Sequence, residues 1–432
     1  MRIVIANPVG RLDNGQHVIL YPSRCDVAMP AHTFSFYPFQ LAYLSALLKR
    51  ELPEYKTTLV DGNRWGWNAE LYIANLAECY RPDVLISECS VLTYGPMTRV
   101  AVAMKQIFGT KTILAGPFGM YAPDQARLNG WDHVVAGEYE AKILAILKGE
   151  PEPEGYIDLD WLPWPEDEDI CRADYIEPIS PFRGIQVYSS RGCPFSCPHC
   201  VAPLYHGGHG KTSRSWRGRD VKDVCAEVEH LVAKYPQTQG ILFYEDTHNV
   251  SAEWTASLSQ ALIRHGLNKR LKFDAMVAYR PFTRDLVELM ARAGYVFFHM
   301  GIESLVPEMG KTLRGKGIFP DKLMQVLGWF KEFGIGVWGA VMIGAQGSSR
   351  EADLATLEGM HELKRRGLVS KIQYSIATPQ PGTPFYEQAR REGWLVTKDF
   401  SQYNWLQSVV GYPHYSAAQI NEMRERYAAE LG

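Results

Sequence analysis

The most informative stretch of the chain is residues 191–200, which read RGCPFSCPHC. It sets Cys193, Cys197 and Cys200 at the spacing C-x3-C-x2-C, with no fourth cysteine nearby. Thiolates this close in sequence can hold one iron–sulfur cluster, and three protein ligands leave one iron open to a small molecule. Structural zinc is the alternative, but it needs a fourth Cys or His at its own short spacing. His199 lies between two ligands and does not easily turn onto the same metal, so the spacing predicts a three-ligand cluster.

The surroundings of this motif carry a resemblance. The motif follows a strand-like segment, 184–190, and a Ser-Arg-Gly turn, and this arrangement closely resembles the radical S-adenosylmethionine (SAM) enzymes. In that family the open iron of a 4Fe-4S cluster chelates SAM, and one electron cleaves SAM to methionine and a 5′-deoxyadenosyl radical. The resemblance implies that the three cysteines bind such a cluster. It also implies an anaerobic enzyme with an electron donor such as flavodoxin or ferredoxin.

Length and composition are those of a large enzyme. With 432 residues, 46% of them apolar, we expect two or three domains with substantial cores. A net charge of −3 gives no basic footprint, which predicts that nucleic acid is not a partner. The chain opens directly into a strand-like segment without a charged leader, and it has no run of 18 apolar residues. Scattered further cysteines are typical of reduced thiols, so we expect a cytoplasmic protein without a membrane span.

Residues 1–147 alternate strand and helix patterns. Strand-like runs lie at 2–6, 57–60, 84–87, 112–115 and 133–135. Such alternation predicts an α/β fold with a doubly wound, Rossmann-like parallel sheet, which binds ligands at the carboxyl ends of its strands. The loops at these ends supply the candidate ligand-binding residues Asn7, Pro8, Ser90, Thr93, Gly116, Pro117, Gly137 and Glu138. From the residues alone, a nucleotide-binding or response-regulator-like domain fits equally well.

Four segments of this region resemble the cobalamin-binding domain that precedes many radical SAM modules. They are 38–44, 81–87, 115–117 and 136–140. The resemblance implies that the eight loop residues contact cobalamin. The Asp-x-His-x-x-Gly signature of the cobalamin mutases is absent, which predicts a lower cobalt face without a protein His ligand. A degenerate domain that binds no cobalamin is the alternative.

The sequence of the remaining residues predicts a linker, a partial barrel and a short C-terminal extension. Residues 148–183 are rich in Pro, Glu and Asp and predict an ordered or semi-stiff linker. Strand-like runs then lie at 184–190, 240–246, 272–279, 295–301, 336–344 and 371–379, separated by helical patterns. Six such units match a partial (β/α)6 radical SAM barrel over 184–392, with its chemistry at the carboxyl ends of the strands. Residues 393–432 form a C-terminal extension, rich in aromatic residues, that is a candidate substrate cap.

Several strand-end residues acquire roles from the resemblance. Glu245 and Asp246 are expected near the SAM amino group, and Glu303 near its ribose hydroxyls. Arg280 is expected to reach the SAM carboxylate or a substrate acid. The full set of predicted SAM contacts is His199, Glu245, Asp246, Arg280, Glu303, Ser304, Gly344 and Thr383. For each charged residue alone, a surface charge or a helix cap is the competing interpretation.

A glycine- and histidine-rich stretch follows the cluster motif. Residues 207–212 resemble a phosphate loop, but Tyr205 stands where that pattern needs glycine. We therefore expect no nucleotide triphosphate there. His206 and His209 are expected to face the substrate or solvent rather than to bind a metal.

Together these resemblances imply a cobalamin-dependent radical SAM methyltransferase that methylates an unactivated carbon. In such enzymes cob(I)alamin takes a methyl group from one SAM, the 5′-deoxyadenosyl radical from a second SAM removes a substrate hydrogen, and the substrate radical takes the methyl group from methylcobalamin. The substrate would lie between the two domains, and an amino-acid residue of a protein or peptide is one candidate. A cobalamin-containing radical SAM cyclase or oxidative rearrangement enzyme is the first alternative. A cobalamin- or redox-sensing binding protein with a structural cluster is the second.

Overall fold

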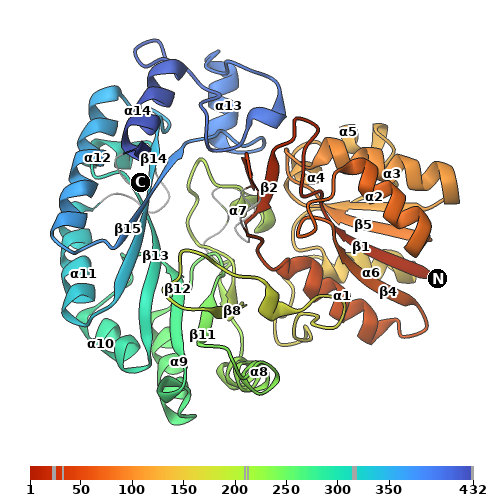
Figure 1. Cartoon of the computed structure of the whole chain (residues 1–432), viewed down its shortest axis with the longest axis horizontal. Coiled ribbons are helices and arrows are strands. Elements are labelled where there is room, and N and C mark those ends of the chain that lie inside the picture. Colours follow the sequence, from red (N-terminus) through yellow and green to blue (C-terminus); the bar gives the residue numbers. More distant parts are fainter. Residues whose placement is uncertain (22–25, 32–33, 209–210, 212–213, 314–318, 430–432) are drawn as a thin grey trace.

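The structure is a computed structural model. It describes the chain except residues 22–25, 32–33, 209–210, 212–213, 314–318 and 430–432. Two parallel sheets with their helices form two units, on the right and on the left of Figure 1. Within the described residues, no helix is both long enough and apolar enough to cross a membrane.

The first unit is a five-stranded parallel sheet with the strand order β4-β1-β5-β6-β7. Its strands are β1 (Arg2–Asn7), β4 (Lys56–Asp61), β5 (Val84–Glu88), β6 (Lys111–Ala115) and β7 (His133–Val134). The chain passes from β1 to β4 on one side and returns to β5 on the other. The topological switch point therefore lies between β1 and β5, where open α/β sheets bind ligands.

Helices cover both faces of this sheet. They include α1 (Phe39–Glu51), α2 (Ala69–Asn75), α3 (Tyr94–Phe108) and α6 (Glu140–Lys148), with the short α4 (Pro117–Tyr121) and α5 (Pro123–Leu128). Alternate residues of β1 point to opposite faces, so Ile3 and Ile5 pack with α1 while Val4 and Ala6 pack with α2 and α3. The doubly wound sheet predicted for this region is confirmed.

An antiparallel hairpin leaves this sheet and was not predicted. Its strands are β2 (His17–Leu20) and β3 (Asp26–Met29), paired from His17 opposite Met29 to Leu20 opposite Asp26. In Figure 1 the hairpin lies between the two units.

The second unit is a six-stranded parallel sheet with the sequential order β8-β11-β12-β13-β14-β15. Its strands are β8 (Gly184–Val187), β11 (Gly240–Phe243), β12 (Lys272–Val277), β13 (Tyr295–Glu303), β14 (Gly336–Ile343) and β15 (Lys371–Ile376). Between them run α8 (Val221–Lys234), α9 (Ala252–Arg264), α10 (Arg284–Arg292), α11 (Pro320–Glu332) and α12 (Arg350–Arg365). Because β8 and β15 are the two edges of the sheet, the barrel is partial, as predicted.

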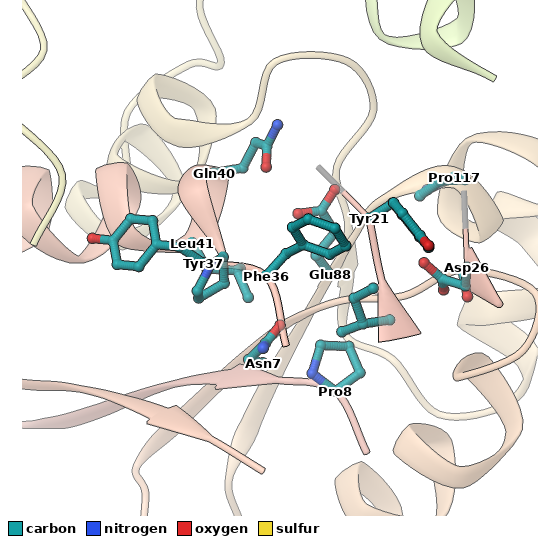
Figure 2. Close-up of a pocket in the computed structure, with 13 residues that line it drawn as sticks. Asn7, Pro8, Tyr21, Asp26, Phe36, Tyr37, Gln40, Leu41, Glu88 and Pro117 are labelled. Carbon is teal, nitrogen blue, oxygen red and sulfur yellow. The ribbon is translucent and has the colours of Figure 1, made fainter. Parts of the chain in front are cut away.

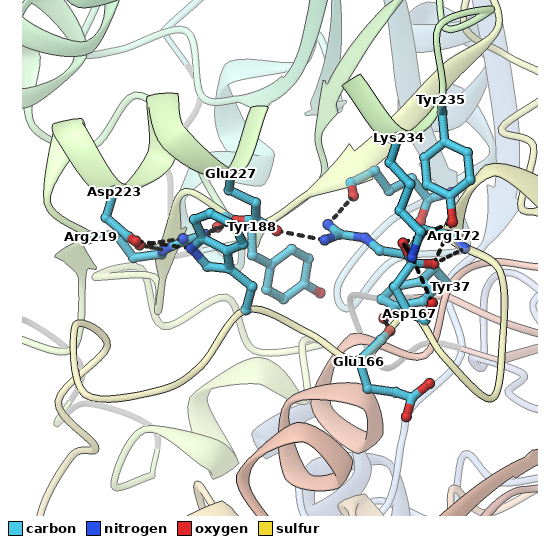
Figure 3. A network of polar contacts seen from close by, with 12 residues as sticks. Tyr37, Glu166, Asp167, Arg172, Tyr188, Arg219, Asp223, Glu227, Lys234 and Tyr235 are labelled. Carbon is cyan, nitrogen blue, oxygen red and sulfur yellow. Dashed lines mark hydrogen bonds and ion pairs between the residues drawn. The ribbon is translucent and has the colours of Figure 1, made fainter. Parts of the chain in front are cut away.

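The linker is tied to the barrel by a buried ionic network, shown in Figure 3. Arg172, in the short helix η2 (Arg172–Asp174), donates to Glu227 of α8 at 2.6 Å, and Arg219 bonds the other oxygen of the same carboxylate. Burial favours a raised pKa for Glu227, but the charges of Arg219 and Arg172 outweigh it and lower the pKa below its usual value. The carboxylate therefore stays ionised between two guanidinium groups.

The C-terminal extension packs against the barrel. After α13 (Pro384–Arg391), which ends the predicted barrel segment, the extension contains the short helix η5 (Phe400–Gln402) and α14 (Ala417–Ala429). The Tyr412 hydroxyl donates to the carbonyls of Gly344 and Ala345, and Tyr403 and Tyr415 are fully buried. The division of the chain at residues 147, 183 and 392 stays a prediction.

Candidate active site

The central cavity lies at the carboxyl ends of the barrel strands and holds about 1300 Å³ of space between protein atoms, open solvent included. Cys193, Cys197 and Cys200 line it from the loop that follows the first barrel strand. The other lining residues are Tyr21, Val27, Phe195, His199, Ala202, Pro203, Tyr244, Asp246, Thr247, Met276, Gly301, Glu303, Trp338, Ala340, Val341, Met342, Gln373, Ser375 and Trp405. The three cysteines thus share one cavity with aromatic, aliphatic and acidic side chains.

The backbone before the cysteine loop is fixed by a tight turn. Gly192 has φ +94°, and a Cβ at this position would lie 2.2 Å from the carbonyl oxygen of Ser215. The Ser215 hydroxyl in turn donates to the Cys193 carbonyl at 2.9 Å. Only glycine fits here, so the Ser-Arg-Gly turn before the cysteines has a steric cause.

The donor set fits an iron–sulfur cluster better than a single ion. Among the described residues, no three Cys, His, Asp or Glu side chains converge as ligands of one metal ion. A 4Fe-4S cluster needs no such convergence, because each of its thiolate ligands binds a different iron. The three thiols line one cavity, which is compatible with a cluster.

Three of the eight predicted SAM contacts line this cavity. They are His199, Asp246 and Glu303. Oδ2 of Asp246 accepts a hydrogen bond of 3.1 Å from the Gly192 amide, which joins the end of β11 to the cysteine loop. Glu303 ends β13 with φ +67°, a left-handed conformation that is costly for a residue with a side chain. Such strain is concentrated at ligand sites and is consistent with a role for Glu303.

Two further predicted contacts lie behind the cavity wall. Glu245 is 1% exposed and accepts hydrogen bonds of 2.6 Å from the Ser189 hydroxyl and 2.6 Å from His248. The Ser304 hydroxyl is buried and lies 2.9 Å from that of Thr356. Both residues brace the strands on which the cavity is built, and neither is among the described residues that line it.

The other three predicted contacts do not line the cavity. The Gly344 amide donates to Asp353 at 2.7 Å, and Thr383 caps the start of α13. Arg280 is exposed and stacks over the ring of Phe319 at 4.9 Å. None of the three is among the described residues that line the central cavity, and their role toward SAM stays a prediction.

A second cavity, of about 500 Å³, lies at the switch point of the first sheet (Figure 2). Four of the eight predicted cobalamin contacts line it, namely Asn7, Pro8, Ser90 and Pro117. Its other lining residues are Leu20, Tyr21, Asp26, Phe36, Tyr37, Pro38, Gln40, Leu41 and Glu88.

Two buried side-chain atoms of this cavity indicate that it binds a polar ligand. Oδ2 of Asp26 and Nε2 of Gln40 have no hydrogen-bond partner among the described residues. In the view of Figure 2 they lie on either side of Glu88 and Phe36. An unpaired buried polar atom costs about 1–3 kcal/mol, so a bound group that both donates and accepts hydrogen bonds is favoured here. Primary carboxamides, which cobalamin carries around its ring, have this property, so the donor set fits that cofactor.

The protonation state of Asp26 follows from its surroundings. Burial raises its pKa to about 7, against a hydrogen bond from Ser90 that lowers it, and the charge of Glu88 raises it further. Near neutral pH this side chain therefore exists in both forms and can donate or accept a hydrogen bond.

The remaining predicted cobalamin contacts do not line the described part of this cavity. The Thr93 hydroxyl accepts a hydrogen bond of 3.1 Å from the Ser90 amide, and so shapes that loop from behind. Gly116 has φ +94°, and a Cβ there would lie 2.8 Å from the Cys89 amide nitrogen. Gly137 and Glu138 follow β7, and Glu138 points toward the barrel.

The two cavities meet at Tyr21, which lines both. Its ring lies 4.7 Å from that of Phe36, which stacks on Tyr244 at 5.2 Å. Next to Tyr21, strand β3 turns Asp26 toward the second cavity and Val27 toward the central one. An aromatic row and a hairpin thus form the partition between the cavities.

Sequence reasoning missed some residues of these sites and misplaced one. His206 was expected to face substrate or solvent, but it is fully buried. Asp26, Gln40 and Trp338 were not selected, because single polar or aromatic residues without a motif carry no signal in the sequence. His209 lies outside the described residues.

Comparisons with known proteins match these features. Residues 187–358 match the family model of the radical SAM superfamily. The chain is 25% identical over 412 residues to an uncharacterized methyltransferase of Pyrococcus horikoshii, which covers 89% of this chain and 85% of that protein. An anaerobic magnesium-protoporphyrin IX monomethyl ester cyclase of Cereibacter sphaeroides is 23% identical over 226 residues, 51% of this chain and 34% of the cyclase.

A solved structure shares the two-unit fold. It is the radical S-adenosylmethionine methyltransferase TsrM of Kitasatospora setae with cobalamin and a 4Fe-4S cluster bound. The TM-score is 0.64 at 15% sequence identity, and the alignment covers 93% of this chain and 84% of that one.

Proposed function

We propose that this chain, of which residues 187–358 match the family model of the radical SAM superfamily, is a cobalamin-dependent radical SAM methyltransferase that acts on an unactivated carbon. The observation that carries the proposal is the arrangement of two cavities that share Tyr21, one lined by the three cysteines and one at the switch point of the first sheet. Radical and methyl-transfer chemistry on one substrate require such neighbouring sites. The methyltransferase of Pyrococcus horikoshii and the fold shared with TsrM support the same choice.

The cofactors supply the difficult chemistry when bound: the cluster with SAM provides hydrogen abstraction, and cobalamin provides the methyl group. The protein's part is to hold and orient them and to exclude water. Cys193, Cys197 and Cys200 would ligate the cluster. Asp246 and Glu303, as carboxylates in the same cavity, would accept hydrogen bonds from the ammonium and ribose groups of SAM.

Cobalamin would be held at the second cavity. Gln40 and Asp26 supply the buried unpaired groups, and Asn7 and Ser90 add polar atoms at the strand ends. The cavity has a volume of about 500 Å³, and no histidine is among the described residues that line it.

The substrate would occupy the central cavity beside Tyr21. Its walls carry Tyr244, Met276, Trp338, Met342 and Trp405, so we infer that the part of the substrate that enters is apolar. Trp405 belongs to the C-terminal extension, which supports its proposed role as a cap. An amino-acid residue of a protein or peptide and a small apolar molecule both fit this description.

The proposal is tested with the anaerobically reconstituted protein. It should bind about four irons and one cobalamin per chain, cleave SAM reductively to 5′-deoxyadenosine, and transfer the SAM methyl group to cob(I)alamin. Neither partial reaction requires the substrate to be known. A protein that cleaves SAM but binds no cobalamin would overturn the methyltransferase proposal.

A second candidate function is a radical SAM cyclase or oxidative rearrangement, which is favoured by the likeness to the Cereibacter sphaeroides cyclase. The mass of the product separates the two, because methylation adds a methylene unit and cyclisation does not. A sensing protein with a structural cluster would show no reductive SAM cleavage at all.

A further inference from the structure

His206 bridges two acidic side chains that come from the two units of the fold. It follows the short helix α7 (Ala202–Tyr205) directly after the cysteine loop, and it is fully buried. Its Nε2 lies 3.2 Å from Oδ2 of Asp246, and its Nδ1 lies 3.5 Å from Oε1 of Glu138. Asp246 follows β11 of the barrel, and Glu138 follows β7 of the first sheet.

Asp246 is held from two directions at the same oxygen. Its Oδ2 accepts a hydrogen bond of 3.1 Å from the Gly192 amide, and it also contacts the Nε2 atom of His206. Its side chain is only 8% exposed, and the exposed part lines the central cavity with the cysteines. Two fixed contacts on one oxygen set the plane of the carboxylate, and with it the direction of the other oxygen.

Glu138 is itself firmly anchored. The guanidinium group of Arg217 bonds both of its oxygens, and the Ile157 amide donates to Oε2 at 2.9 Å. Burial favours a raised pKa for Glu138, but the contact with His206 and the charges of Arg191 and Arg217 outweigh it and hold the pKa far below its usual range. Glu138 therefore stays charged at physiological pH.

We propose that His206 is a positioning residue for SAM, which holds the Asp246 carboxylate in the central cavity and is itself held by Glu138 of the first unit. The inference rests on the proposed function, because it takes Asp246 to be a SAM contact. It gives the first unit a second role besides cofactor binding: it completes the SAM site across the interface. Oriented hydrogen-bond partners behind a ligand-binding group commonly tune its affinity in this way.

The test compares two isosteric replacements. In His206→Gln the side-chain amide can reproduce the Nε2 donor toward Asp246, whereas in His206→Asn it can reproduce only the position of Nδ1, toward Glu138. SAM affinity is measured by equilibrium dialysis and by the change that SAM causes in the electron paramagnetic resonance spectrum of the reduced cluster. We expect SAM binding in His206→Asn to weaken about ten- to a hundred-fold, and in His206→Gln to stay within about three-fold of wild type.

His299→Asn is the matched control. His299 is also buried and bonds an acidic residue, Asp274, at 2.8 Å, but it is not among the described residues that line the central cavity. We expect the His299→Asn substitution to lower the stability of the protein without a specific loss of SAM affinity. In both His206 variants, we expect the iron content and cobalamin binding to match those of wild type. Glu138→Gln should weaken SAM binding in the same direction as His206→Asn.

Three outcomes would overturn the inference. Unchanged SAM affinity in His206→Asn would do so while leaving the proposed function intact. Equal losses in His206→Asn, His206→Gln and His299→Asn would show a general effect of disturbing the core. A wild-type protein that binds iron but no SAM would overturn the proposed function together with the inference.

Discussion

The hydroxyl of Tyr205 donates a hydrogen bond of 2.6 Å to Oε1 of Glu88, and so joins the helix after the cysteine loop to the end of strand β5. The Tyr139 hydroxyl bonds the other oxygen of the same carboxylate at 2.8 Å. Nearby, Arg191 pairs with Glu140 at 2.8 Å, and both side chains are buried. These contacts connect the cysteine loop to the first sheet.

Replacing Cys193, Cys197 and Cys200 together by Ala should abolish the cluster. Each substitution removes a bond to iron that none of the neighbouring side chains can replace. Iron analysis and the visible absorption of the reconstituted protein check this. Cys225→Ala, a buried cysteine of α8 outside the cavity lining, should keep its iron. Iron near four per chain in the triple variant would contradict the assignment.

Two substitutions of Glu303 separate the contribution of its carboxylate to SAM binding from the backbone strain at this position. Glu303→Gly should relieve the left-handed conformation and raise the free energy of unfolding by about 1 kcal/mol, yet it removes the carboxylate. Glu303→Gln keeps the shape and the strain but loses the charge. We expect both variants to bind SAM about ten- to a hundred-fold more weakly, while only the glycine variant gains stability. Unaltered SAM affinity in both would exclude Glu303 as a contact.

Asp26 makes stability depend on pH in a defined direction. Its pKa is raised from 3.8 to about 7, so the folded protein holds a proton that the unfolded chain releases. The stability from this group is complete below about pH 4 and is lost as the pH rises to about 7. Asp26→Asn lacks this titration, so the variant without cofactor should become progressively more stable than wild type across this range. Unfolding in urea at several pH values measures the difference, and a difference independent of pH would refute the prediction.

Gln40→Leu should have opposite effects on stability and on cofactor binding. It removes a buried amide nitrogen that has no partner in the described structure, at nearly constant volume. We therefore expect the cofactor-free protein to gain about 1 kcal/mol, while cobalamin binding weakens. Thermal unfolding and a spectroscopic cobalamin titration measure the two quantities. Tighter or equal cobalamin binding would remove Gln40 from the proposed site.

For the ionic network shown in Figure 3, we expect one conservative substitution to lower the free energy of unfolding strongly. Glu227→Gln leaves Arg172 and Arg219 buried without their shared counter-ion, which should cost about 3–5 kcal/mol in the free energy of unfolding. Asp223→Asn, whose side chain is 38% exposed, should cost less than about 1 kcal/mol. Similar losses in both variants would show that burial does not set the value of this network.

The strands of both sheets could be predicted because each is a short apolar run between helical patterns. All six predicted barrel strands overlap observed strands. Strand β13 begins where predicted but continues past residue 301 to Glu303. The hairpin could not be predicted in the same way, because β2 and β3 follow β1 without a helix between them. The alternation of strand and helix patterns that marks the other strands is missing there.

The site was predictable where a cysteine spacing or the end of a strand marked it. The cysteine spacing identifies its own chemistry, and strand ends suggested Asp246 and Glu303. The burial of His206 comes from Glu138 and Asp246, which lie far from it along the chain and from each other. Nothing local distinguishes His206 from an exposed histidine in a glycine-rich loop. Tertiary packing decided that position.

The hairpin has a consequence for how such an enzyme changes specificity. Asp26 and Val27 are consecutive in β3 but line different cavities. A slip of one residue in the pairing of β2 with β3 would exchange these two side chains between the cavities. One insertion or deletion between β2 and β3 would thereby put an isopropyl group into the cavity at the switch point and a carboxylate into the central cavity. Variation in the length of this hairpin would therefore alter both sites at once, whereas point substitutions alter them one at a time.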